Sequence, residues 1–212
     1  MTQSDKRATQ LSVQDVALIV GGGPGISSSC ARLFAESGMR VGVAARNPEK
    51  AVLETLEKTH GVRRYACDAS EPAAVERLFE KVVEDIGTPR LVVHNIDGRV
   101  PGILRKSVIE ADPVMALETL RNAAFSAFLV GQQAARLMLG NEPDANGAKG
   151  TIIFTNASAA LKGFPSSGAF AMACHAKSGL AQSMARELMP QGIHIANVPI
   201  ENTGFRARAI RR

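Results

Sequence analysis

The stretch that decides the fold is Val-Ala-Leu-Ile-Val-Gly-Gly-Gly-Pro-Gly-Ile-Ser, residues 16–27. Five apolar residues in a row predict a buried strand, the glycines predict a tight turn, and apolar residues at helical spacing over residues 25–37 predict a helix. Glycine lets the backbone adopt positive φ and come close to an anion, and the start of a helix offers unpaired N–H groups and the positive end of its dipole. The stretch therefore predicts a phosphate-binding turn. An ordinary connection between a strand and a helix is the alternative.

The size and composition of the chain favour a single domain. It has 212 residues, of which 45% are apolar, enough for one sizeable core. We expect a polar N-terminal tail over residues 1–12, one domain over residues 13–200 and a basic tail over residues 201–212. Most of the formal net charge of +5 comes from four arginines of that last tail, so nucleic-acid binding is not expected: Arg206, Arg208, Arg211 and Arg212.

The cysteines, the hydropathy and the histidines exclude other classes. Cys30, Cys67 and Cys174 are odd in number and far apart, which is typical of reduced packing residues rather than of a disulfide framework. No apolar stretch approaches the roughly 18 residues of a membrane span, and residues 1–14 lack the apolar core of a signal peptide. The histidines show no spacing typical of metal ligands. We therefore expect a cytoplasmic protein without a metal site or a membrane partner.

Apolar runs alternate with helical patterns along the chain. Strands are expected at residues 16–20, 41–45, 63–67, 91–94, 151–155 and 193–198, and helices at residues 25–37, 48–59, 71–86, 113–138 and 168–189. Repeated units of this kind predict an α/β fold with a doubly wound parallel sheet. In such a sheet a ligand binds beyond the carboxyl ends of the strands. The functional residues should therefore follow Val20, Ala45, Cys67, His94 and Thr155.

Four motifs stand at these positions in a characteristic order. They are the glycine turn at residues 21–27, Cys67-Asp68 after the third strand, Val-His-Asn-Ile-Asp at residues 93–97, and Lys-Ser-Gly-Leu at residues 177–180. Together they resemble the short-chain dehydrogenase/reductase family from about residue 13 to residue 198. The resemblance implies a Rossmann-like three-layer sandwich that binds NAD(P)(H). It also implies transfer of a hydride between the nicotinamide and a carbonyl, an alcohol or an activated alkene of a small-molecule substrate.

The same resemblance implies a set of cofactor-binding residues. Arg46 ends the second strand, where an NAD-binding relative has an acidic residue that holds the ribose hydroxyls. A guanidinium there would pair with the 2′-phosphate of NADP, so we expect NADP(H) in preference to NAD(H), with a solvated loop arginine as the alternative. The other cofactor-binding residues implied are Gly21, Gly23, Gly25, Ile26, Asp68, Asn95 and Lys177.

The catalytic residues depart from the family pattern. In the family a Tyr hydroxyl exchanges the proton, a Lys four residues later lowers its pKa, a Ser orients the carbonyl and an Asn supports a proton relay. Lys177 matches the lysine, and Ser158 is the candidate serine. Ala173 stands four residues before Lys177, and Ala123 stands at the position of the relay Asn. Without the Tyr, water would supply the proton.

A second register remains open. Phe170 lies seven residues before Lys177, which is the Tyr-x6-Lys spacing of the enoyl-reductase branch of the family with Phe in place of Tyr. Residues seven apart share a helix face, but Phe cannot donate a proton. A core aromatic is the alternative for Phe170, and a surface lysine for Lys177. Two functions therefore stand: an oxidoreductase with Lys177 and Ser158 as catalytic residues, or a non-catalytic, NADP(H)-binding or partner-regulating protein with a degenerate active site.

The end of the chain and the long helices bear on assembly. Relatives generally continue past the sixth strand with a substrate-covering segment and a final strand and helix, so we expect a fold truncated after the sixth strand, with an open sheet edge. The helices near residues 113–138 and 168–189 correspond to those that pair between subunits in similar proteins. They predict a homodimer through Phe125, Phe128, Leu129 and Met184.

Overall fold

The computed structural model describes residues 15–200, so the two tails expected at residues 1–12 and 201–212 lie outside the described residues. Six strands form one sheet in the order β3-β2-β1-β4-β5-β6, and every neighbouring pair is parallel. The strand order reverses between β1 and β4, which confirms the doubly wound, Rossmann-like sheet. The strands are β1 (Val16–Val20), β2 (Arg40–Ala45), β3 (Arg63–Ala66), β4 (Pro89–His94), β5 (Gly150–Ala157) and β6 (Ile193–Ile200).

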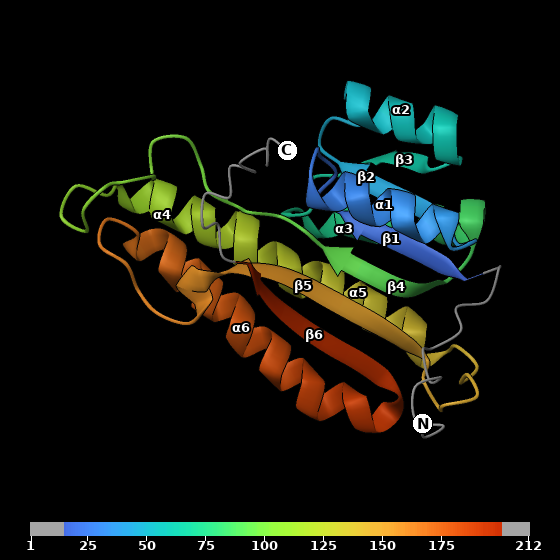
Figure 1. Cartoon of the computed structure of the whole chain (residues 1–212). Coiled ribbons are helices and arrows are strands. Elements are labelled where there is room, and N and C mark those ends of the chain that lie inside the picture. The colour runs from blue at the N-terminus through green and yellow to red at the C-terminus, as the bar shows by residue number, and fades with distance from the viewer. Residues whose placement is uncertain (1–14, 201–212) are drawn as a thin grey trace, which may run out of the picture.

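Helices cover the sheet on both faces (Figure 1). Those of the described residues are α1 (Ile26–Glu36), α2 (Ala51–His60), α3 (Pro72–Ile86), α4 (Pro113–Leu120), α5 (Ser126–Leu139) and α6 (Gly168–Leu188). α1 and α2 pack on one face, and α3, α5 and α6 pack on the other. In Figure 1 the face of β5 and β6 opposite α5 and α6 carries no helix of the described residues.

The buried strand β1 shows why this sequence makes a three-layer fold. Val16, Leu18 and Val20 pack into the core under α3 and α5, and the alternate residues Ala17 and Ile19 pack into the core under α1 and α2. Successive side chains of a strand point to opposite faces, so an unbroken apolar run requires a layer of helices on each side. The apolar run at residues 16–20 therefore becomes a central strand of the sheet.

One predicted helix contains an irregular turn in the structure. The expected helix at residues 113–138 consists of α4 and α5 with a π-helical turn, Arg121–Phe125, between them. The Ser126 hydroxyl donates to the Asn122 carbonyl, and Gly98 approaches this turn so closely that a Cβ there would lie 2.5 Å from the Ala123 Cβ. The helix expected at residues 113–138 is therefore present without a break in helical conformation, and what the sequence did not predict is the π-helical turn within it. π-Helical turns of this kind occur frequently at functional sites.

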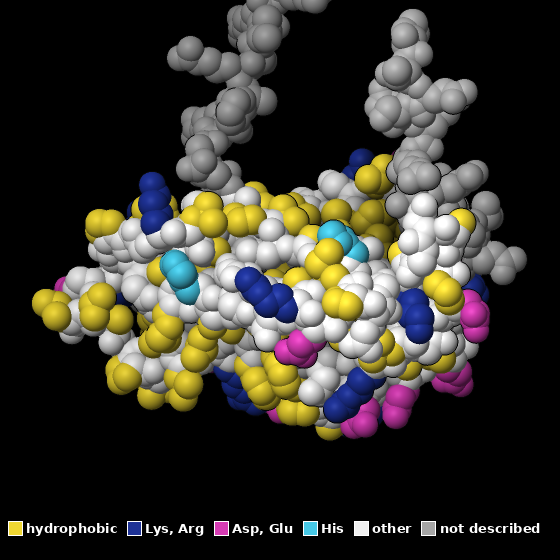
Figure 2. Space-filling view, turned by 90° about the horizontal axis from the view of Figure 1, so that it is seen from below, with side chains coloured by type: hydrophobic (Ala, Val, Ile, Leu, Met, Phe, Trp, Pro, Cys, Tyr) yellow, Lys and Arg dark blue, Asp and Glu magenta, His cyan; other side chains and the backbone are white. Residues whose placement is uncertain are grey.

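The structure shows the state of the cysteines and the position of the exposed hydrophobic side chains. None of the helices in residues 15–200 is long and apolar enough to cross a membrane. All three cysteines are free thiols, and Cys67 and Cys174 are buried. Hydrophobic side chains reach the surface at the end of the molecule formed by α4 and the loop before it (Figure 2), where Val108, Ile109 and Val114 are exposed.

Candidate active site

The glycine turn joins β1 to α1 and is closed by backbone bonds. The N–H groups of Gly21 and Gly22 donate to the Ala44 carbonyl at 2.9 and 2.8 Å. Gly21 has φ of +109°, and a Cβ at this position would lie 2.2 Å from the Asn95 carbonyl oxygen. A side chain here is therefore excluded by the protein itself. Around Gly23 and Gly25 a Cβ would meet nothing within 4 Å, so this part of the turn faces open space.

A chain of side-chain hydrogen bonds fixes the turn to the sheet. The Ser27 hydroxyl donates to the Gly21 carbonyl at 2.7 Å and accepts from Asn95 Nδ2 at 2.6 Å. Asn95 Oδ1 in turn accepts from the Thr155 hydroxyl at 2.8 Å. The network joins the turn to the ends of β4 and β5, so Asn95 acts on the turn through its side chain.

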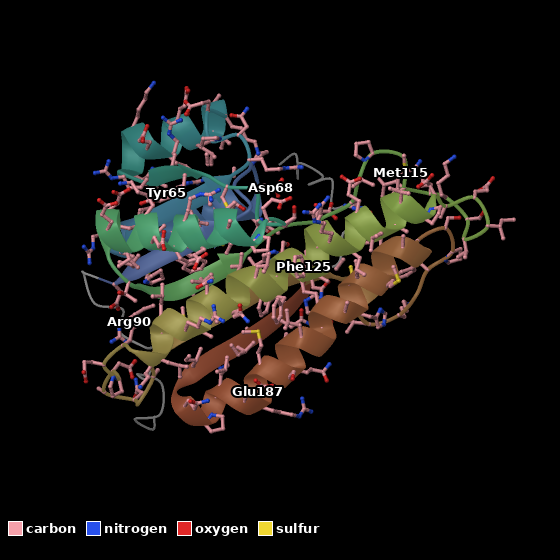
Figure 3. All side chains as sticks on the ribbon, turned by 180° about the vertical axis from the view of Figure 1, so that it is seen from behind. Tyr65, Asp68, Arg90, Met115, Phe125 and Glu187 are labelled. Atoms are coloured by element: carbon pink, nitrogen blue, oxygen red, sulfur yellow. The ribbon has the colours of Figure 1, made fainter. Side chains whose placement is uncertain are left out.

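A first cavity of about 270 Å³ lies beside the glycine turn, between the ends of β1, β2 and β3. It is lined by Gly21, Arg46 and Asp68, among others. Burial alone would raise the pKa of the Asp68 carboxyl. The N–H and the hydroxyl of Ser70 both donate to its Oδ1, and the charge of Arg46 lies nearby. Together these groups lower the pKa of Asp68 overall. Asp68 is therefore an ionised acceptor at neutral pH, at the end of β3 (Figure 3).

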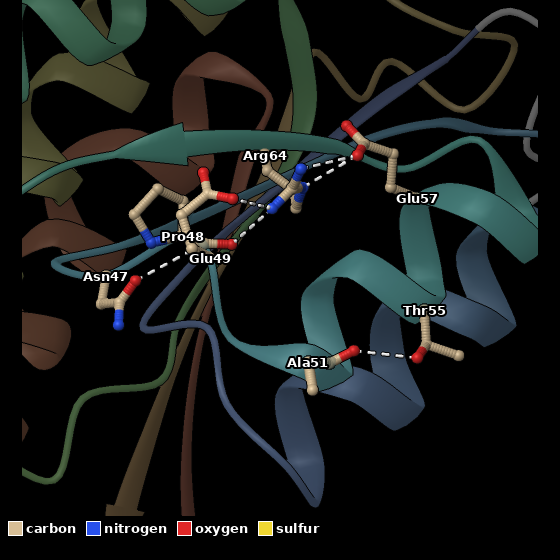
Figure 4. A network of polar contacts seen from close by, with 7 residues as sticks. All are labelled: Asn47, Pro48, Glu49, Ala51, Thr55, Glu57 and Arg64. Atoms are coloured by element: carbon tan, nitrogen blue, oxygen red, sulfur yellow. Dashed lines mark hydrogen bonds and ion pairs between the residues drawn. The ribbon is translucent and has the colours of Figure 1, made fainter.

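Hydrogen bonds and ion pairs hold the loop that carries Arg46 in place. The Lys50 ammonium donates to the Gly22 carbonyl at 2.8 Å, which joins this loop to the glycine turn. Arg64 on β3 donates to the Pro48 carbonyl at 2.9 Å and pairs with Glu49 and Glu57 (Figure 4). Arg46 itself is exposed and lines the first cavity, so its guanidinium is available to an anion there.

A second cavity of about 250 Å³ lies between β5 and α6. Lys177 is 3% exposed, and its ammonium donates to the carbonyls of Ile96 at 3.0 Å and Thr155 at 3.2 Å. These bonds use two of the three N–H donors of an ammonium. Burial lowers the pKa of Lys177 to about 8, while the nearby Cys174 and Asp97 act in the opposite direction. Lys177 is thus a buried cation at neutral pH and not a surface lysine.

The structure brings together most, but not all, of the predicted site residues. Asn95 lines both cavities, and Ile26 lines the second one from the start of α1. Ser158 begins a 3-10 turn, and Ala157 rather than Ser158 is among the residues that line the second cavity. The catalytic role of Ser158 therefore stays a prediction.

The two registers of the α6 motif differ in the structure. Phe170 lines the second cavity together with Lys177. Ala173 is fully buried and is not among the lining residues. The seven-residue spacing thus places a side chain in the cavity, and the four-residue spacing does not.

The two cavities share Asn95, Ile96, Asp97 and Arg99 among their lining residues, and together they form one groove. The sequence did not indicate three residues of this groove. Cys174 lines the second cavity beside Lys177, and Asp97 and Arg99 line both cavities. Arg99 is paired with Asp97, and its guanidinium lies 4.6 Å from the centre of the Phe170 ring. Helical periodicity back from Lys177 could have found Cys174, three residues earlier. No local pattern indicated Arg99, because its place depends on the loop after β4.

The sequence of this chain matches known proteins over most of its length. The model of the family described as enoyl-(acyl carrier protein) reductase matches residues 21–201. Among curated proteins, 3beta-hydroxysteroid dehydrogenase of Mediterraneibacter gnavus is 28% identical over 185 residues, which cover 85% of this chain and 63% of that protein. The chain belongs to the short-chain dehydrogenase/reductase family.

Further relatives agree with this assignment. Short chain aldehyde dehydrogenase 1 of Euphorbia lathyris is 25% identical over 182 residues, which cover 85% of this chain and 60% of that protein. The chain thus spans about three fifths of the length of these two curated relatives. The crystal structure of a short-chain dehydrogenase from Rhodopseudomonas palustris is 30% identical, with a TM-score of 0.73 over 86% of this chain and 82% of that one.

The groove fits the NAD(P)(H) cofactor that this family uses. α1 begins at Ile26, its N-cap Gly25 provides no side-chain hydrogen bond, and its first turn carries no acidic residue, so its N–H groups are open to an anion. The backbone at Gly23 and Gly25 faces free space. The two cavities meet at Asn95 and Ile96, which line both. A dinucleotide could therefore bind along the strand ends, with its pyrophosphate near the glycine turn.

Proposed function

We propose that this chain is an NADP(H)-preferring oxidoreductase that transfers a hydride between the nicotinamide and a carbonyl, an alcohol or an activated alkene. The observation that carries the proposal is the pair of cavities along the strand ends, with exposed Arg46 at one end and the buried ammonium of Lys177 at the other. Membership of the family supports the same reaction class.

Each end of the groove has its own task in cofactor binding. The glycine turn, Gly21, Gly23 and Gly25, would receive the pyrophosphate at the start of α1, next to Ile26. Arg46 would pair with the 2′-phosphate, and the ionised Asp68 would accept from the adenine. Asn95 would hold the turn in shape, and the free N–H of Lys177 would donate to the nicotinamide ribose.

The bound cofactor supplies or receives the hydride. Lys177 places a positive charge beside the reacting carbonyl, where negative charge develops on oxygen, and the backbone carbonyls that hold its ammonium fix its position. We assign Ser158 to polarise the substrate oxygen, from the turn that follows β5. Phe170 and Ala157 would give the substrate an apolar wall on one side of the second cavity.

The cofactor preference tests the first part of this proposal. NADPH should bind more tightly than NADH, and Arg46→Ala should remove the preference, because loss of a charge-assisted phosphate contact costs roughly 1.5–3 kcal/mol, about ten- to hundredfold in affinity. Titration that follows the fluorescence of the reduced cofactor measures the dissociation constants of NADPH and NADH. Arg32→Ala, an exposed arginine on α1 outside both cavities, is the matched control. Equal affinities for the two cofactors in the unaltered protein would refute the preference.

Turnover tests the second part. NADPH oxidation with a panel of aldehydes, ketones, quinones and enones should show turnover in the unaltered protein. Turnover should fall by about 10²-fold or more in Lys177→Met, because a placed charge at a developing oxyanion contributes on that order. Tight NADPH binding with no turnover across the panel would instead leave a non-catalytic dinucleotide-binding protein.

We also propose that the chain is a cytoplasmic homodimer. Phe125 and Phe128 stack with ring centres 6.3 Å apart and remain 41% and 42% exposed, which is unusual for two neighbouring aromatics (Figure 3 labels Phe125). Leu129 and Met184 are each 8% exposed and belong to the core, so the two phenylalanines would contribute most of the contact surface. Light scattering at micromolar concentration should give a dimer, and Phe128→Asp should give a monomer. The three free thiols support a reducing compartment.

A further inference from the structure

The second cavity lacks the hydroxyl that the family uses, but it does not lack an acidic hydrogen. Phe170 and Ala173 occupy the two positions at which a Tyr was expected, and neither can donate a proton. Cys174 directly follows Ala173 in the sequence, and it lines the same cavity as Lys177, which stands three residues later on one face of α6. It is 3% exposed and packs against Ala159, Ala160 and Ala171 in the wall of this cavity, so its thiol is shielded from bulk water.

The backbone of Cys174 is held in place by the strand opposite. Asn156 at the end of β5 donates from Nδ2 to the Cys174 carbonyl at 3.1 Å and to the Ser178 hydroxyl at 3.2 Å. Asn197 on β6 donates to the same hydroxyl at 3.0 Å. This buried network fixes α6 against β5 at the level of Cys174. The position of the thiol in the cavity is thus set by polar contacts as well as by packing.

The surroundings of the thiol match the needs of a proton donor. Burial raises the pKa of the Cys174 thiol, and Asp97 acts in the same direction, so the sulfur carries its hydrogen at neutral pH. The Lys177 ammonium, the Ala157 N–H and Arg99 act in the opposite direction and would stabilise the thiolate formed when the proton leaves. A thiol that is protonated at rest and has cations beside its conjugate base can give up and regain a proton during turnover.

We propose that Cys174 is the general acid of this site and donates the proton to the substrate oxygen during carbonyl reduction. This inference rests on the proposed oxidoreductase function. As the hydride adds to the carbonyl carbon, the π pair of the C=O bond moves to oxygen and forms an O–H bond with the hydrogen of Cys174. The S–H bond breaks and its electron pair stays on sulfur as a thiolate. The thiolate regains a proton from the Lys177 ammonium, which takes one from water. In the oxidation of an alcohol the same protons move in reverse.

The first test needs no turnover. The full chain is treated with methyl methanethiosulfonate between pH 6 and 10, and modification of each cysteine is followed by mass spectrometry. NADP⁺ should slow modification of Cys174 at least tenfold and leave that of Cys30, which lines neither cavity, unchanged. Lys177→Met should slow modification of Cys174 severalfold at pH 7, because loss of the nearby ammonium raises the pKa of the thiol and leaves less thiolate to react. A Cys174 rate that responds to neither change overturns the proposal.

The second test measures the proton step. With NADPH and 4-nitrobenzaldehyde, Cys174→Ala should lower kcat by about 10²-fold or more with unchanged NADPH affinity. Cys174→Ser should keep part of the rate and move the alkaline limb of the pH profile upward, because a hydroxyl loses its proton less readily than a thiol. Cys30→Ala should behave as the unaltered protein. A Cys174→Ala rate equal to that of the unaltered protein overturns the assignment, as does NADPH binding without any reduction of the aldehyde. Failure of the unaltered protein to bind NADPH would overturn the proposed function instead.

Discussion

The two ends of the groove differ in what makes them work. At the glycine turn the important groups are backbone atoms, and a chain of hydrogen bonds through Ser27, Asn95 and Thr155 holds them in place. At α6 the important groups are side-chain atoms, and there Phe170 and Ala173 stand where a hydroxyl was expected. Anion binding uses main-chain N–H groups, which every residue except proline carries, whereas acid catalysis depends on one side-chain atom. The difference explains how the chain keeps a cofactor groove while its reacting end has changed.

The largest effect is expected at Gly21. Gly21→Ala would force a Cβ to within 2.2 Å of the Asn95 carbonyl at a φ of +109°. Both the overlap and the conformation are unfavourable, so the free energy of unfolding should fall by about 4 kcal/mol or more, toward complete unfolding. Urea denaturation measures the change. Gly23→Ala is the control, because its Cβ would meet nothing within 4 Å, and it should fold normally. Equal stability of the two variants would show that the turn is not held as described.

The buried ammonium of Lys177 makes stability depend on pH. Its pKa is lowered from 10.5 to about 8 by burial, so between pH 8 and 10.5 the unfolded chain binds more protons than the folded one. The free energy of unfolding should therefore rise with pH across this window, by about 3 kcal/mol from Lys177 alone, and should not change from this cause below pH 8. In Lys177→Met this rise should be absent. Denaturation of both proteins at pH 7, 9 and 10.5 gives the difference, and parallel curves would contradict the burial of a charged lysine.

Much of the fold follows from short-range patterns. β1 and the helix after it were predicted from an apolar run and a glycine turn, and both occur within a residue of the expected bounds. The π-helical turn at Arg121–Phe125, which Gly98 approaches closely from another part of the chain, was not predicted. Local periodicity carries no information about such a contact.

The site was predictable where the backbone defines it. Glycines at fixed spacing indicated the turn, and a lysine in an apolar helix indicated Lys177, which the structure buries beside the second cavity. Which residue next to Lys177 enters the cavity was not predictable, because neighbouring positions on a helix differ by 100° and the tilt of α6 decides between them. The pairing of Arg99 with Asp97 likewise depends on the path of a loop.

Substituting Tyr at either of the two candidate positions on α6, residues 170 and 173, should have an intermediate effect on stability and turnover. Ala173→Tyr would insert a ring at a fully buried position, and this overpacking should cost about 1–3 kcal/mol of stability. Phe170→Tyr adds only a hydroxyl to a ring that already lines the cavity, so its stability should change little. In the Cys174→Ala background, Phe170→Tyr should restore part of the carbonyl reduction, because it brings back a donor. Thermal unfolding and turnover of NADPH measure both. A stable, active Ala173→Tyr protein would favour the four-residue spacing instead.

The smallest effect is expected in the hydrogen bonds beneath the turn. Ser27→Ala removes the acceptor of Asn95 Nδ2 and a donor to the Gly21 carbonyl, so it should cost about 1–2 kcal/mol and weaken NADPH binding. Ser28→Ala is the matched control, because Ser28 donates only to the Gly25 carbonyl, which also accepts from the Ser29 N–H at 2.9 Å. No buried group loses its sole partner there, and the cost should stay below about 0.5 kcal/mol. Chemical denaturation and NADPH titration of both variants decide the point. If Ser28→Ala lost as much stability and affinity as Ser27→Ala, the start of the helix, and not the link to Asn95, would be what shapes the turn.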